Sequence, residues 1–340
     1  MPSVLELFNQ NEVLNYLKDR QYPALLGESL FPEVKKQSLT FDQIKGAGRV
    51  PVVASVHAFD TEAEIGSREG SKQALELALI KRKIQLKEKD IIALEQPRNP
   101  AEQQYLMKEV YNDVDMLVAG VRARVEVMRM EALANGTVTA NENNLSLTIS
   151  YGVPSDHKEV LSGTDLWTNT ASDPIGDMER WADALDVKPT RALTSKTVRN
   201  ALLRHPNIIG ALFGSNSLRV PTVADLNAFL TQHGLPVIAT YDEVYRKQKA
   251  NGTYDRLRYF PANKFVMFGP DALGETLYGP TAEEIRLTRD PSIKTEMVGK
   301  VLAMVYEESK DPVSTWTKAV ATALPSFPAA DEVFQAQPIA

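Results

Sequence analysis

The stretch PAEQQYLMKEVYNDVDMLVAGVRARVEVMRMEALAN, residues 100–135, predicts a single long helix. It follows Asn99, a residue type that caps helices, and it opens with proline, which fits the first helical position. Glu102 stands three residues after the cap, and Asn135 and Gly136 supply the left-handed residue that often ends a helix. A helix over this stretch would span about 54 Å, whereas typical globular helices have about 10–14 residues. We therefore expect a strut around which the rest of the chain is built.

One apolar stripe runs along this predicted helix. Its members recur at steps of three and four: Met107, Val110, Tyr111, Val114, Leu117, Val121, Val125 and Met128. Ten of the other 28 positions carry charged residues, so a single face is expected to be buried. The stripe drifts and holds no sustained heptad, so a coiled coil is not predicted.

The composition is that of a globular protein of one to three domains, with 340 residues, 43% hydrophobic and 24% charged. No apolar run approaches the length of about 18 residues that suggests a membrane span, and residues 1–20 lack a signal-peptide pattern. The chain has no cysteine, which excludes disulfides, thiolate metal sites and a cysteine nucleophile. Its four histidines show no ligand spacing, so no metal and no cofactor are predicted. The net charge of -6 argues against a protein that grips nucleic acid, but not against a wall that nucleic acid merely faces.

The first 90 residues predict parts that extend from a compact body. Residues 3–20 predict an amphipathic helix, and the prolines that follow favour an extended arm, which could pack on its own domain or on a neighbouring chain. Residues 38–90 are rich in strand-like segments around a polar, glycine-bearing tip at 65–72. A two-stranded excursion of this kind is marginal alone in water, so we expect it to lie on a partner subunit.

Two patterns resemble nucleotide-binding or catalytic motifs, but neither has the spacing that its motif requires. The glycines before Ser71 and Lys72 resemble a phosphate-binding loop, but the spacing between them is one residue short and Ser71 precedes the lysine. Ser155, Asp156 and His157 are the residue types of a catalytic triad, but they are consecutive, whereas a triad converges from separate elements. We therefore predict a hairpin tip, a polar turn and no catalytic residues.

From about residue 168 the chain alternates between helices and strands, which predicts a compact α/β domain. Helices are expected at 174–184, 196–205 and 223–233, and strands at 192–195, 235–241 and 264–268. Asn251 and Gly252 between two strand-like runs predict a β-hairpin. Strands at 301–306 and 315–322 resemble the earlier sheet segments, so the chain is expected to leave one domain, build a second and return to the first.

The order of these parts resembles the major capsid proteins of tailed phages, most closely the lambda major head protein E family. The likeness covers nearly the whole chain and rests on motifs that are weak one by one: Glu28-Ser-Leu-Phe-Pro-Glu-Val, the stretch 50–70, Asn251-Gly252, Tyr259-Phe-Pro-Ala-Asn-Lys-Phe-Val, Gly274-x-x-x-Tyr278-Gly279, Asp311-Pro312, Ala323-Leu-Pro-Ser-Phe-Pro and Asp331.

This resemblance implies an α+β chain with the Hong Kong ninety-seven-type capsid fold. By position, the N-terminal arm is 1–36, the extended β-hairpin loop 37–90, the peripheral domain 91–168 plus 300–340 with its spine helix at 100–135, and the axial α/β domain 169–299. Candidate intersubunit contacts are Arg68, Glu69 and Lys72 at the loop tip, and Asn251 and Gly252 in the axial-domain hairpin. No covalent cross-link is assigned to Lys72.

The resemblance also implies a function. The chain would be a non-enzymatic major capsid protein that self-assembles through pentamers and hexamers into an icosahedral phage head, around double-stranded DNA held without sequence-specific binding. Scaffolding and portal proteins are implied partners and a decoration protein is left open, with assembly in the host cytoplasm, procapsid maturation, and the virion as final location. The alternatives are a nanocompartment shell of the same fold and, with less support, a nucleotide-dependent enzyme.

Overall fold

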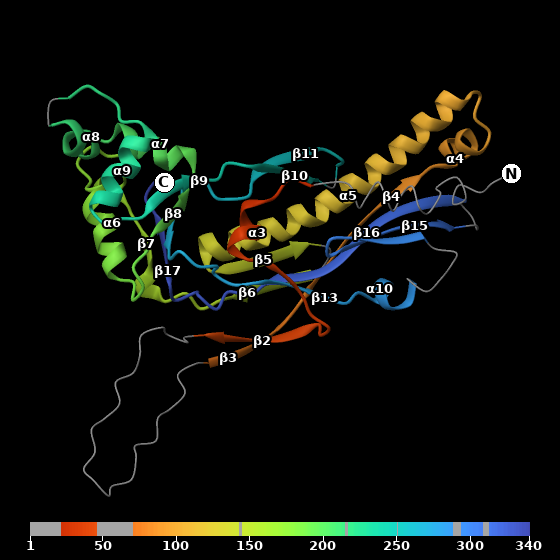
Figure 1. Ribbon diagram of the computed structural model, residues 1–340, viewed down its shortest axis with the longest axis horizontal. Coiled ribbons are helices and arrows are strands. Elements are labelled where there is room, and N and C mark those ends of the chain that lie inside the picture. Colours follow the sequence, from red (N-terminus) through yellow and green to blue (C-terminus); the bar gives the residue numbers. More distant parts are fainter. Residues whose placement is uncertain are drawn as a thin grey trace, which may run out of the picture. The chain divides into compact units, whose positions relative to one another are not determined.

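The computed structural model describes residues 22–45, 71–142, 145–214, 217–249, 251–287, 294–308 and 313–340. The chain divides into two compact units. Their helices and strands are labelled in Figure 1. Unit 1 holds the described residues within Met1–Phe41, Leu75–Glu126 and Glu275–Pro325, and unit 2 those within Asp42–Ala74, Val127–Gly274 and Ser326–Ala340.

The predicted long helix is confirmed as α5, Pro100–Asn135. Asn99 caps it by accepting the Glu102 backbone N–H at 2.8 Å, and the Glu102 carboxylate accepts the Arg98 backbone N–H. Gly136 ends it in the left-handed region with φ of 67°. The last carbonyls of the helix also find a donor, because the Gln335 side-chain amide lies 2.7 Å from the oxygen of Leu133.

The apolar stripe of α5 is confirmed from Val110 onward, since Val110, Val121 and Met128 are at most 3% exposed. The burial is wider than a stripe near the end of the helix, where Val127 and Met130 are buried as well. Two charged residues, Glu126 and Arg129, are also buried there, which the simple one-face pattern did not predict.

Unit 1 is built on a six-stranded sheet whose central strand is β16, Ser314–Pro325. Along one side β16 pairs with β4 (Ala78–Leu86), and along the other with β15 (Val301–Glu308) and then β13 (Thr276–Gly279), all antiparallel. The outer strands are β14 (Lys294–Val298) and β1 (Glu33–Lys35), which runs parallel to β13. The unit also contains the helices α3 (Leu26–Leu30), α4 (Glu88–Glu95) and α10 (Ala282–Leu287). The strands predicted at 301–306 and 315–322 are thus neighbours in one sheet.

Unit 2 contains a five-stranded sheet in the order β7-β17-β12-β8-β9. These strands are β7 (Lys158–Val160), β17 (Val333–Gln337), β12 (Phe265–Phe268), β8 (Arg191–Thr194) and β9 (Val237–Thr240). Four helices accompany it: α6 (Pro174–Asp183), α7 (Lys196–Arg204), α8 (Pro206–Phe213) and α9 (Val223–Gln232). The helices and the sheet share one apolar core in which Trp167, Trp181, Phe265 and Phe334 pack ring against ring.

Two hairpins and two short 3₁₀ turns complete unit 2. One hairpin pairs β5 (Thr137–Glu142) with β6 (Leu145–Ser150), and the other pairs β10 (Val244–Gln248) with β11 (Tyr254–Arg258). The turns are Ser155–His157 and Gly163–Asp165. A separate pair of strands, β2 (Thr40–Lys45) and β3 (Ser71–Glu76), flanks the undescribed residues 46–70.

Most of the helices and strands expected between residues 168 and 270 are confirmed, although α8 was not predicted there. Outside that range, β5, β13, α10 and β14 are among the elements that were not predicted. The expected capsid subdivision stays a prediction. The pairing adds that β4, within the range expected for the extended loop, joins the sheet of unit 1, and that β17 joins the sheet of unit 2.

Candidate assembly surfaces

The five residues expected to contact other subunits fall into two groups. Arg68 and Glu69 lie outside the described residues, and Lys72 lies in β3, where the backbone alone is described. Asn251 and Gly252 lie in the described hairpin. An intersubunit role for these residues stays a prediction.

The turn between β10 and β11 explains why Asn251 and Gly252 stand together. Gly252 has φ of 83°, a left-handed conformation that glycine adopts without strain. The Asn251 side chain accepts the Thr253 backbone N–H at 3.1 Å and the Thr253 hydroxyl at 2.7 Å. The turn therefore fixes the register of a hairpin whose strands carry many exposed, charged side chains.

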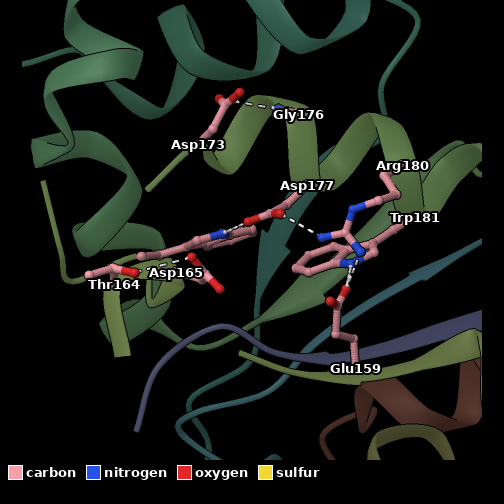
Figure 2. A network of polar contacts seen from close by, with 9 residues as sticks. Glu159, Thr164, Asp165, Asp173, Gly176, Asp177, Arg180 and Trp181 are labelled. Atoms are coloured by element: carbon pink, nitrogen blue, oxygen red, sulfur yellow. Dashed lines mark hydrogen bonds and ion pairs between the residues drawn. The ribbon is translucent and has the colours of Figure 1, made fainter. Parts of the chain in front are cut away.

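A polar network fastens α6 to the sheet of unit 2 (Figure 2). Glu159, on the edge strand β7, accepts hydrogen bonds from Arg180 at 2.7 Å and from the indole N–H of Trp181 at 2.5 Å. Asp177, one turn earlier on α6, accepts from Arg180 and from the indole N–H of Trp167, at 2.7 and 2.9 Å. Both buried tryptophans thus have acceptors, which a buried indole N–H needs.

The same network has a clear electrostatic character. The hydrogen bond to Glu159, followed in size of effect by the one to Asp177, raises the pKa of the Arg180 guanidinium, so this group stays charged. Asp173 caps the start of α6 by accepting the Gly176 backbone N–H at 3.3 Å. The contacts of Asp177, Arg180 and Trp181 thus attach α6 to Trp167 and to strand β7.

A second polar network, in unit 1, holds the chain from Tyr22 to α3 against α5. The Tyr22 hydroxyl donates to Asp115 at 2.7 Å, and Arg122 forms an ion pair with Glu28 at 2.6 Å. The buried Glu126 carboxylate accepts the Gly27 backbone N–H at 2.9 Å. No sequence pattern indicated the role of Glu126, which sits beside the apolar stripe.

His205 is a buried polar residue that no sequence pattern indicated. His205 caps α8, because its Nδ1 accepts the Asn207 backbone N–H at 3.2 Å. Its Nε2 lies 2.9 Å from the Asn169 carbonyl oxygen and 3.0 Å from the Ser172 hydroxyl. Since Nδ1 accepts, Nε2 must carry the proton and donate. His205 therefore joins the segment around 170 to the helix pair α7 and α8.

The patterns considered for chemistry have ordinary structural surroundings. Ser155, Asp156 and His157 form one 3₁₀ turn, as predicted, so their side chains come from a single short segment. Ser71 and Lys72 begin a strand, whereas a phosphate-binding loop leads into a helix. In the described part of the chain no group of acidic and histidine side chains could hold a metal ion, and no helix there is long and apolar enough to cross a membrane.

Comparison with known proteins gives a family. The model of the family "Phage major capsid protein E" matches residues 9–337, which is nearly the whole chain. No curated protein sequence matches this chain.

Solved structures with a similar fold include a prophage protein of Escherichia coli CFT073 to which a capsid role is assigned. It has 14% sequence identity and a TM-score of 0.63, and the match covers 98% of this chain and 99% of that one. A phage-related protein of Bordetella bronchiseptica RB50 has 14% identity and a TM-score of 0.53, with 96% of each chain covered. At such identity these likenesses establish the fold. The fold is the predicted mixture of helix and strand of the Hong Kong ninety-seven type, and the chain belongs to the phage major capsid protein E family as a shell-forming capsid protein.

Proposed function

We propose that copies of this chain assemble through pentamers and hexamers into the icosahedral head of a tailed phage, around double-stranded DNA. The observation that carries this proposal is the family match over residues 9–337. The role is mechanical, and no catalytic step is assigned to the chain. Scaffolding and portal proteins are proposed partners, with assembly in the host cytoplasm, and a decoration protein stays open.

Within this proposal the chain keeps the subdivision expected from the sequence. The arm is 1–36, the extended loop 37–90, the peripheral domain 91–168 plus 300–340, and the axial domain 169–299. The net charge of -6 suits an inner wall that does not hold packaged DNA tightly. The weak exposed ion pairs of such a surface, each worth about 0–1 kcal/mol, allow errors of assembly to be corrected before many copies lock together.

Expression of the chain, alone and with the scaffolding protein of its phage, tests the proposal. We expect closed, uniform shells in negative-stain electron microscopy and a fast-sedimenting species in ultracentrifugation. Particles from infected cells should contain nuclease-protected double-stranded DNA. Small soluble species under every condition would contradict the proposal, and shells filled with a cargo protein instead of DNA would favour a nanocompartment.

A further inference from the structure

The hairpin β10–β11 carries an unusual pair of like charges. Arg246 and Arg256 lie directly opposite each other across the two strands, so their side chains leave the same face of the hairpin. Both are exposed, and with Val244 and Tyr245 they line an open hollow of about 510 Å³. Like charges directly opposite destabilise a strand pair. The repulsion between Arg246 and Arg256 therefore lowers the stability of the hairpin.

The other basic residues of the hairpin show that the pair is an exception. Lys247 forms an ion pair with Glu142 at 2.6 Å, Lys249 with Asp255 at 2.7 Å, and Arg258 with Asp242. Arg246 and Arg256 have no ion-pair partner within the described residues. The two charges that lack an acidic partner are thus the two that face each other.

At the end of α6 lies an acidic surface whose carboxylates have no basic partner among the described residues. Glu179, Asp183 and Asp186 are exposed, and none has an ion-pair partner in the described part of the chain. Glu179 and Asp183 stand four residues apart on one helix face, where like charges repel. Asp183 is also the last residue of α6, at the helix end that disfavours negative charge. The acids at the start of the helix, Asp173 and Asp177, are instead bonded within the chain.

We propose that the arginine pair Arg246 and Arg256 binds the acidic surface Glu179, Asp183 and Asp186 of a second copy of this chain. Each surface holds like charges side by side without an ion-pair partner among the residues that the structure describes, and the two surfaces have opposite charge. Both lie in unit 2 but on separate elements, the hairpin and α6 (Figure 1). A contact between two different surfaces of identical chains is head-to-tail, and such contacts form a ring when the rotation between neighbours closes. The inference rests on the proposed function, because it names contacts between neighbours in a ring of the shell.

A phosphate backbone is the competing occupant, and the charges favour the second copy. The hairpin offers two arginines with no ion-pair partner in the described part of the chain, and its other cations form ion pairs with Glu142, Asp242 and Asp255. Binding along nucleic acid needs a broader run of unpaired cations. The carboxylates of α6, in contrast, are present once in every neighbour.

Charge reversal in the full chain tests the pairing. The variant R246E/R256E and the variant E179K/D183K/D186K should each lower the yield of shells by at least about tenfold, because like charges then meet between copies. The chain that combines all five changes should restore the yield to within about threefold of the unaltered protein, since the pairing is rebuilt with reversed sign. The variant K108E/R204E, with two exposed cations reversed elsewhere, is the matched control and should assemble normally.

A neutral variant distinguishes loss of the contact between copies from failure of the subunit to fold. R246Q/R256Q removes the repulsion within the hairpin, so its unassembled subunit should melt at a temperature equal to or above that of the unaltered chain while its shell yield falls. Normal yields from both single-surface reversals, or a combined variant no better than the poorer of the two, would overturn the pairing. Normal shells with reduced DNA content would assign the arginines to nucleic acid instead. Absence of shells from the unaltered chain would overturn the proposed function itself, and the pairing with it.

Discussion

Gly274 shows at the scale of one residue why the motif Gly274-x-x-x-Tyr278-Gly279 is tightly constrained. A methyl group at Gly274 would lie 2.1 Å from the Ser326 carbonyl oxygen and 3.0 Å from the Pro328 ring. The first of these atoms belongs to the backbone and cannot move aside cheaply. The motif was found as a pattern of letters, but its physical cause is a close approach of residues far apart in the sequence.

We expect Gly274→Ala to destabilise the subunit by about 2–4 kcal/mol, the range of overpacked or strained sites. Chemical denaturation of the unassembled subunit measures this change. Gly120→Ala is the matched control, because a methyl group at Gly120 meets nothing within 4 Å and α5 continues on both sides. It should stabilise the subunit by about 0.5–1 kcal/mol. Equal effects of the two changes would contradict this account.

Single residues were predictable where their cause is local. The caps Asn99 and Gly136 and the turn residues Asn251 and Gly252 act within a few positions, so their letters indicated their roles. The burial of Glu126 depends on the Gly27 backbone, which is distant in the sequence, and no local signal indicated it.

At the scale of elements, the attachment of α6 depends more on one hydrogen bond than on its ion pairs. The Arg180 side chain is 54% exposed, so its pair with Glu159 is worth about 0–1 kcal/mol. Trp181 is fully buried, and an indole N–H left without an acceptor costs about 1–3 kcal/mol. Glu159 makes both contacts, and the hydrogen bond from Trp181 should contribute more to stability than the ion pair with Arg180.

Substitutions at Glu159 separate these two contributions. Glu159→Ala should lower the free energy of unfolding by about 2–3 kcal/mol, since it leaves Trp181 without its acceptor. Glu159→Gln keeps an acceptor oxygen and should cost about 1 kcal/mol or less. The remaining cost of the glutamine variant should shrink in 1 M salt, whereas the alanine variant should keep most of its cost, because the lost hydrogen bond to the buried Trp181 is not screened. A larger loss of unfolding free energy in the glutamine variant than in the alanine variant would contradict this account.

The elements that sequence missed have weak local patterns. The segment of α8 contains a glycine and is apolar nearly throughout, so it lacks the polar face by which a surface helix is recognised. Its cap is histidine, which is not among the usual capping residues. The strand β5 follows directly on the end of α5, where the helix signal dominated the interpretation.

At the scale of the whole molecule, the pairing of distant strands was the least predictable feature. Periodicity located β4 and β16 only as strand-like stretches, and it did not locate β17. A strand's partners and register depend on which faces of the sheet are buried, and residues distant in the sequence decide this. In the structure β16 receives β4 from residues 78–86, and β17 enters between β7 and β12. The family resemblance, rather than the alternation of residues, carried the prediction of the fold.

The position of β17 means that unit 2 cannot be complete without the last strand of the chain. β17 pairs with β12 on one side and β7 on the other, Phe334 stacks on Trp181, and Gln335 caps the end of α5. Removal of residues 333–340 would expose the edge of β12, whose four residues are all buried. We expect this truncated chain to be insoluble or to lose cooperative thermal unfolding, with rapid proteolysis within unit 2. Phe334→Leu, which keeps the strand and most of the apolar volume, should cost about 1–2 kcal/mol and leave a cooperative transition in circular dichroism. A truncated chain that melts like the intact one would show that the sheet closes without β17.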